Sequence, residues 1–202
     1  EKLKAMLSSA SELLYWLTIR NTVNQESCYD EIDFFMSAID EGINTHTLLE
    51  AIFVGNEALM KLCPLSYISD CVALIVRNGR KPRYLTLLAN LTHAGDKNIL
   101  DKQFEVILSL SHAEHFDDVI LYFCSVFDDE YEEKRSKMAP FLSKRDISPN
   151  MLSEDIAYHM ALVRTVASCT VGKVNITSVE AKVQSMWSFV DVVNAMLDPK
   201  SL

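Results

Sequence analysis

The sequence predicts an all-helical protein built as an α-solenoid, a stack of helical hairpins. Glycine and proline are scarce, with 5 of each in 202 residues, whereas antiparallel sheets need many tight turns made from them. Apolar residues recur at the three- and four-residue spacing of helices along most of the chain. In two successive segments a proline just inside a helix start is followed by a glycine past its end, which indicates helical hairpins.

The first predicted helix runs from the start of the chain to about Arg20. A polar loop is expected over 21–27, after which Ser27 caps a second helix that Gly42 ends as its C′ residue. Because the chain opens directly inside the apolar stripe of the first helix, we expect it to be a segment of a longer protein. That stripe comprises Leu3, Met6, Leu7, Ala10, Leu13, Leu14 and Leu17.

Prolines and glycines divide the middle of the chain. Short helices are predicted at about 47–53 and 56–62. Pro64 then lies in the first turn of a helix that Gly79 ends, and Pro82 opens another that Gly95 ends. One more helix is predicted over 102–110.

The last part of the chain is less uniform. The dense apolar run at 116–127 fits a buried helix and a short extended segment equally well, because periodicity does not separate them. A loop is expected over 140–149, a helix from Ser153, and a final amphipathic stretch over 179–197. With no tetratricopeptide or ankyrin consensus, the pattern favours the looser armadillo- or HEAT-like stacking.

The sequence lacks the motifs of nucleotide, nucleophile and metalloprotease sites, so we expect no enzyme and no cofactor. The net charge of −9 argues against broad binding to nucleic acid or anionic membranes. The five cysteines lie mostly among apolar neighbours, which is typical of reduced core thiols in a cytosolic protein. His112 and His115 have a spacing that suits a divalent metal, but a polar loop is the favoured interpretation, since structural sites need four ligands.

One basic cluster stands out from the acidic average. Four cations lie within seven residues, between two predicted helices, and Pro82 places the positive end of the second helix beside them. Such an arrangement can hold a phosphate or carboxylate. Structural or inter-domain salt bridges are the favoured alternative, because cations also suit the C-terminal end of the first helix. The cluster consists of Arg77, Arg80, Lys81 and Arg83.

Residues 76–88 and residues 158–173 form two blocks that resemble the RIH domains of inositol 1,4,5-trisphosphate and ryanodine receptors. Residues 76–88 are similar to a helix–hinge–helix that several copies share. The second block resembles the central, second RIH domain of the inositol trisphosphate receptor, and weaker similarity extends over 45–198. This second block reads Tyr158-His159-Met160-Ala161-Leu162-Val163-Arg164, followed by Ala167-Ser168-Cys169-Thr170-Val171-Gly172-Lys173.

The resemblance implies a single armadillo-like domain over 1–202, with N-terminal helices at 1–44 and an RIH-like core at 45–198. It implies a regulatory segment on the cytosolic face of the endoplasmic reticulum or another calcium store, in a channel that is a homotetramer. Its partners would be other domains of the same receptor and neighbouring subunits, with no nucleic acid and no membrane insertion, and the isolated segment would be monomeric. The alternatives are an inositol trisphosphate-binding domain and a free-standing armadillo-type adaptor.

One departure from the family pattern separates these functions. The first RIH domain of these receptors forms half of the ligand pocket and carries an Arg-Lys pair at the hinge. The matching residues here are Arg77 and Asn78. Losing one charge-assisted contact to phosphate costs about 1.5–3 kcal/mol, roughly ten- to a hundredfold in affinity. We therefore predict no useful binding of inositol trisphosphate by this chain alone.

Overall fold

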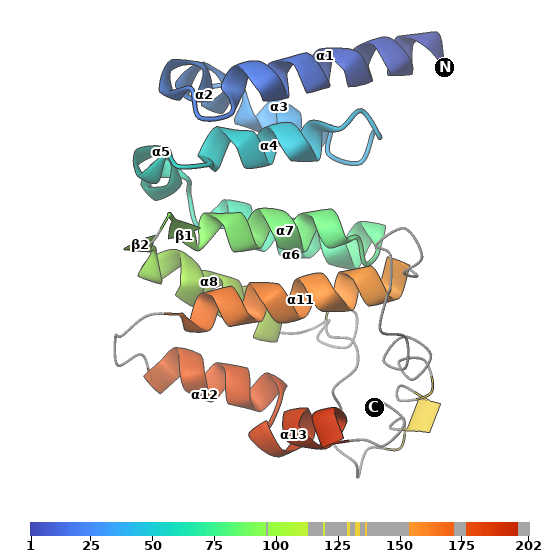
Figure 1. Cartoon of the computed structure of the whole chain (residues 1–202), viewed down its shortest axis with the longest axis vertical. Helices are drawn as coiled ribbons and strands as arrows, with labels where there is room; N and C mark the ends of the chain where they lie inside the picture. The colour runs from blue at the N-terminus through green and yellow to red at the C-terminus, as the bar shows by residue number, and fades with distance from the viewer. Residues whose placement is uncertain are drawn as a thin grey trace.

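The computed structural model describes residues 1–95, 97–112, 119, 129, 132–133, 136, 154–171 and 177–197. Apart from one short pair of strands, the regular structure in these residues is helical, which confirms the all-α prediction. The helices lie in successive layers from the N-terminus to the C-terminal part of the chain (Figure 1). No described helix is both long enough and apolar enough to span a membrane.

The N-terminal layers are built from short helices around one long helix. Here α4 contacts the long helix α1 on one side and α7 on the other, so it lies inside the stack. Six of its nine residues are accordingly buried. The elements are α1 (Lys2–Thr18), α2 (Thr22–Tyr29), α3 (Ile32–Ser37), α4 (Thr45–Phe53) and α5 (Glu57–Leu62).

Two predictions in this region are wrong. The segment 21–27 is not a loop, because Asn21 caps α2 by accepting a hydrogen bond from the backbone N–H of Asn24. Ser27 therefore lies within α2 and is not a cap. The polar α2 is held by Gln25, whose Nε2 donates to two backbone carbonyls of the α4 end at 2.9 Å each. Gly42 is not a C′ residue either, since α3 already ends at Ser37.

The middle and C-terminal layers contain the longer buried helices. The predicted end of α6 and the start of α7 are confirmed, with Gly79 at φ +89° after α6 and Pro82 in the first turn of α7. Pro64 was expected in the first turn of α6, which is wrong, because the helix begins at Ser66 with Leu65 as its N-cap. The remaining elements are α6 (Ser66–Asn78), α7 (Pro82–Leu91), β1 (His93–Ala94), β2 (Lys97–Asn98), α8 (Leu100–Ser111), α11 (Glu154–Thr170), α12 (Thr177–Met186) and α13 (Phe189–Leu197).

The sequence predicts that Gly95 ends α7, and this prediction is wrong. The helix stops at Leu91, and the Thr92 hydroxyl donates to the carbonyl of Ala89 at 2.7 Å. Gly95, at φ +60°, instead lies between the two short antiparallel strands, in which His93 pairs with Asn98. The left-handed backbone that glycine tolerates is thus used for a hairpin turn.

Helix α11 contacts both α7 and α8, and the second family-like block contributes buried residues to α11, among them Tyr158, Leu162 and Cys169. The Thr165 hydroxyl donates to the carbonyl of Leu85 in α7 at 3.0 Å. Gln103 of α8 donates through Nε2 to the carbonyls of Ser168 and Val171 at 3.0 and 3.1 Å. Since buried polar groups are costly unless paired, these bonds fix α11 against its neighbours.

The final amphipathic stretch is divided into two helices by Trp187 and Ser188. In the second of them, Phe189 and Val190 are 77% and 62% exposed. Apart from residue 119, the stretches 116–127 and 140–149 and the predicted helix start at Ser153 lie outside the described residues.

Candidate functional site

The basic cluster converges on one carboxylate that the sequence analysis did not single out. Asp40 lies in the connection between α3 and α4, and it accepts hydrogen bonds from four side chains of the α6–α7 hinge. The Nδ2 of Asn78 donates at 2.5 Å and the Nζ of Lys81 at 3.1 Å. The guanidinium of Arg83 and the hydroxyl of Tyr84 donate as well. We call these five residues the Asp40 hub.

The local backbone explains why the hinge presents these groups together. Gly79 reverses the chain after α6 with a positive φ, and Lys81 continues in an extended conformation. Pro82, with its fixed φ, then starts α7. Lys81 and Arg83 thus flank the helix start, and both reach Asp40, which is 41 and 43 residues away in sequence.

The hub is partly shielded from solvent, so its charges interact strongly. Burial by itself would raise the pKa of Asp40. Hydrogen bonds from Tyr84, Lys81, Arg83 and Asn78 outweigh that effect and lower the pKa to about 2. Nearby, burial and the Arg83 cation lower the pKa of His46. Asp40 is therefore ionised at neutral pH and neutralises cations that would otherwise repel one another.

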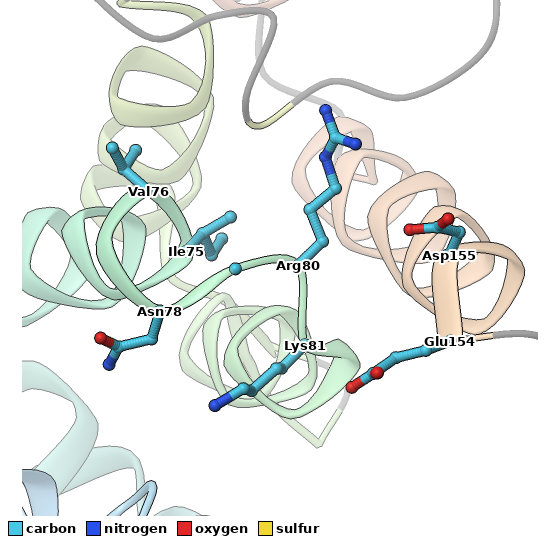
Figure 2. A pocket seen from close by; sticks show the side chains of 8 residues that line it. Ile75, Val76, Asn78, Arg80, Lys81, Glu154 and Asp155 are labelled. Carbon is cyan, nitrogen blue, oxygen red and sulfur yellow. The ribbon is translucent and has the colours of Figure 1, made fainter.

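Beside the hub a pocket of about 510 Å³ opens between the hinge and the start of α11. Arg80 and Lys81 line it on the hinge side, and Glu154 and Asp155 on the other. Figure 2 shows the two carboxylates pointing from α11 towards the hinge, while Arg80 extends away from Lys81. The pocket is thus lined by side chains of both charges and by two apolar side chains of α6, Ile75 and Val76.

The predicted cluster is therefore divided by the fold. Lys81 and Arg83 form ion pairs with Asp40, Arg80 lines the pocket, and the Nε of Arg77 donates to Asn78 at 3.4 Å. The carboxylates of α11 across the pocket would repel a multiply charged anion bound there. The arrangement is better suited to a polypeptide segment that carries both signs of charge. No local pattern marks Asp40, because its partners lie about forty residues downstream.

Within the described part of the chain, no three His, Cys, Asp or Glu side chains gather in a way that suits a metal ion. The candidate partner of His112, His115, lies outside the described residues. Burial raises the pKa of Cys63 to about 11 and that of Cys169 to about 12, so these thiols are protonated at neutral pH. They have the properties of core residues and not of nucleophiles or ligands.

Comparison with known proteins identifies the class to which this fold and hinge belong. The family model of the RIH domain matches residues 1–115. This stretch is more than half of the 202 residues, and it includes the Asp40 hub and the hinge. The chain belongs to the RIH-domain family of the inositol trisphosphate and ryanodine receptors.

A particular relative agrees with this assignment. The chain is similar to the inositol 1,4,5-trisphosphate receptor itr-1 of Caenorhabditis elegans, with 31% identity over 179 residues. The similarity covers 83% of this chain but 6% of that receptor. The chain thus spans a small fraction of the length of this relative.

Proposed function

We propose that this chain is a non-catalytic cytosolic segment of an intracellular calcium-release channel, and that it relays ligand binding to the pore through contacts between domains. The family assignment and the name of the nematode relative support this proposal. As the family resemblance implies, the channel would lie in the membrane of the endoplasmic reticulum or another calcium store, as a homotetramer. This segment would correspond to the central RIH domain.

The observation that carries the relay is the Asp40 hub. It joins the connection between α3 and α4 to the hinge between α6 and α7, and so links two layers of the stack through charged hydrogen bonds. Coupling between distant sites travels through contacts of this kind when packed elements shift against one another. A displacement of the N-terminal layers would therefore reach the hinge and the pocket next to it.

The test compares two acidic residues that each bind two cations. Asp40→Ala removes the hub, whereas Glu57→Ala removes the exposed ion pairs with Lys61 and Lys97. In the receptor that carries this segment, we expect Asp40→Ala to shift the ligand concentration for half-maximal calcium release by about fivefold, a typical coupling effect. Glu57→Ala should leave it within about twofold of wild type, as expected for a surface pair.

Two outcomes would count against the relay. The first is an unchanged response in Asp40→Ala receptors that reach the wild-type expression level. The second is an equal shift in Glu57→Ala receptors, because it would mean that the response depends on surface charge in general. Ligand binding is measured in parallel, so that a change in affinity at the ligand site is not mistaken for lost coupling.

The second candidate function is binding of inositol trisphosphate by this segment, and the cations beside the pocket favour it. The acids opposite them, and the use of Asn78, Lys81 and Arg83 by Asp40, oppose it. Isothermal titration calorimetry with inositol 1,4,5-trisphosphate should show no saturable heat at micromolar concentrations. Saturable binding that Arg77→Ala abolishes would replace the relay with a ligand-binding function.

A further inference from the structure

The outermost helix of the stack, α1, presents an unusual pair of faces. Figure 1 shows α1 at the N-terminal end of the stack, with α4 on one side and no described element beyond it. The only residues of α1 that are buried are polar, namely Ser11 and Thr18. A helix at the surface of a globular protein normally turns its apolar stripe inward, and α1 does not.

The inner face of α1 is held by polar contacts. The hydroxyl of Thr18 lies 3.3 Å from the Sγ of Cys28 in α2. Nearer the middle of the helix, the Nδ2 of Asn44 donates to the hydroxyl of Ser8 at 2.8 Å. These bonds anchor the helix at two points along its length. Its orientation is thus set by the stack and not by burial of its apolar side chains.

The apolar stripe remains exposed along the whole helix. Leu3, Met6 and Leu13 are 64%, 62% and 60% exposed, and Leu17 is 50% exposed. Leu7 and Leu14 lie nearer the stack and are 41% and 37% exposed. A contiguous apolar surface of this extent marks an interaction site more often than a free surface.

The spacing of the stripe indicates what kind of surface covers it. Leu3, Ala10 and Leu17 are separated by seven residues, as are Met6 and Leu13, and Leu7 and Leu14. This is the a, d and e pattern of a helix that packs lengthwise against another helix. From Leu3 to Leu17 the stripe is about 21 Å long at the rise of an α-helix, which matches one partner helix of three to four turns.

We propose that this face of α1 binds an amphipathic helix of a neighbouring helical hairpin in the receptor polypeptide. The proposal rests on the proposed function, because it takes the segment to be part of a receptor. The nematode relative is far longer than this chain, so a receptor of this family contains other polypeptide to fill the site. Within the stack, α4 is covered in the same way, by α1 on one side and α7 on the other. In repeat proteins, a terminal unit without a polar outer face needs a further unit or a cap.

The test measures how fast single cysteines on α1 react with a maleimide. Leu13→Cys lies in the stripe and Glu12→Cys, its matched control, lies on the solvent side of the same helix, where Glu12 is exposed. Both are placed in a background with Cys124→Ser. The described native cysteines are buried, so they contribute little to the signal. Each variant is examined in the 202-residue chain and in the intact receptor.

In the isolated chain the two engineered cysteines should react at similar rates. In the intact receptor we expect Leu13→Cys to react at about one tenth of its rate in the isolated chain, or more slowly still, because labelling then requires a local opening. The rate for Glu12→Cys should change little. Equal rates for both positions in the receptor would overturn the docking proposal, and normal calcium release by the same receptor would show that the relay function survives it.

A different occupant would also be revealed. If Leu13→Cys is already protected in the isolated chain, and light scattering shows twice the monomer mass, a second copy covers the stripe and the neighbouring hairpin does not. The double variant Leu13→Lys, Leu17→Lys serves as a further check, since both side chains are largely exposed and the isolated chain should keep its helix content. In the receptor, Met6→Cys read in this background should react as fast as in the isolated chain, because Met6 lies in the same stripe and is 62% exposed there. Continued protection of Met6→Cys would contradict the proposal.

Discussion

Helices α1 and α11 have the same length, 17 residues, but opposite relations to the rest of the molecule. Helix α11 contacts α7 and α8, and its apolar residues Leu162 and Val166 are buried. In α1 the apolar residues face outward and the polar Ser11 and Thr18 face the stack. The comparison shows that amphipathicity predicts a helix without predicting which of its sides meets a neighbour within the same segment.

The largest expected effect is a difference in the free energy of unfolding between variants that lose an apolar side chain of α11 and variants that lose one of α1. Leu162→Ala in α11 should lower the free energy of unfolding by about 2–5 kcal/mol, because it leaves a cavity. Leu13→Ala in α1 should change it by less than about 0.5 kcal/mol, since Leu13 is exposed. Urea denaturation followed by circular dichroism measures both. Equal losses would mean that the α1 stripe is buried in solution.

A smaller effect is expected at the hub that ties the α3–α4 connection to the hinge. Asp40→Ala should cost about 1–3 kcal/mol, because Arg83 is left partly buried without its carboxylate. The pKa of Asp40 is lowered from 3.8 to about 2 in the folded chain. Its contribution is therefore complete above about pH 4 and is lost as the pH falls towards 2. The stability difference between wild type and variant should be full at pH 5 and much smaller at pH 2.5, as unfolding curves at the two pH values would show, and an equal difference at both would contradict this.

The hydrogen bonds of α11 should contribute more to stability than those of α1, as its apolar contacts do. Thr165→Val removes the buried bond from α11 to the carbonyl of Leu85 and should cost about 1–2 kcal/mol. Ser8→Ala removes the exposed bond between α1 and Asn44 and should cost less than about 0.5 kcal/mol. Thermal unfolding of both variants provides the comparison, and a larger loss for Ser8→Ala would reverse it.

The smallest predicted effect concerns Glu50 in α4, the helix that α1 covers. Burial raises the pKa of Glu50 from 4.5 to about 7. The folded state therefore keeps a proton that the unfolded state has lost, and stability falls as the pH rises from about 4.5 to 7. Glu50→Gln should remove this fall and stabilise the chain at pH 8 by about 1 kcal/mol, less than the full shift because water reaches the carboxylate. An unchanged pH profile in the variant would show that Glu50 titrates normally.

Local sequence signals accounted for most of the described helices. Gly79 and Pro82 marked the end of α6 and the start of α7, and these boundaries lie where the sequence placed them. The polar α2 was missed because it has no apolar stripe. Its central side chain, Gln25, is buried against carbonyls 26 and 29 residues away, and no local pattern reveals such a contact.

Only part of the candidate site could be predicted from the sequence. Four cations in seven residues were evident, but the carboxylate that binds two of them was not, since Asp40 lies in an ordinary acidic segment before Gly42. The acids across the pocket, Glu154 and Asp155, looked like favourable charges at the start of a helix. Only the packing of α11 against the hinge region brings them near Arg80.

The sequence by itself determined the helical class, most helix boundaries and the family, because caps, proline, glycine and apolar spacing act over a few residues. The tertiary structure decided which faces are buried, which acid neutralises the hinge, and that the stripe of α1 remains open. Burial and charge pairing depend on neighbours far away in sequence, and for α1 the neighbour that would complete the pattern lies outside the stack formed by the described residues.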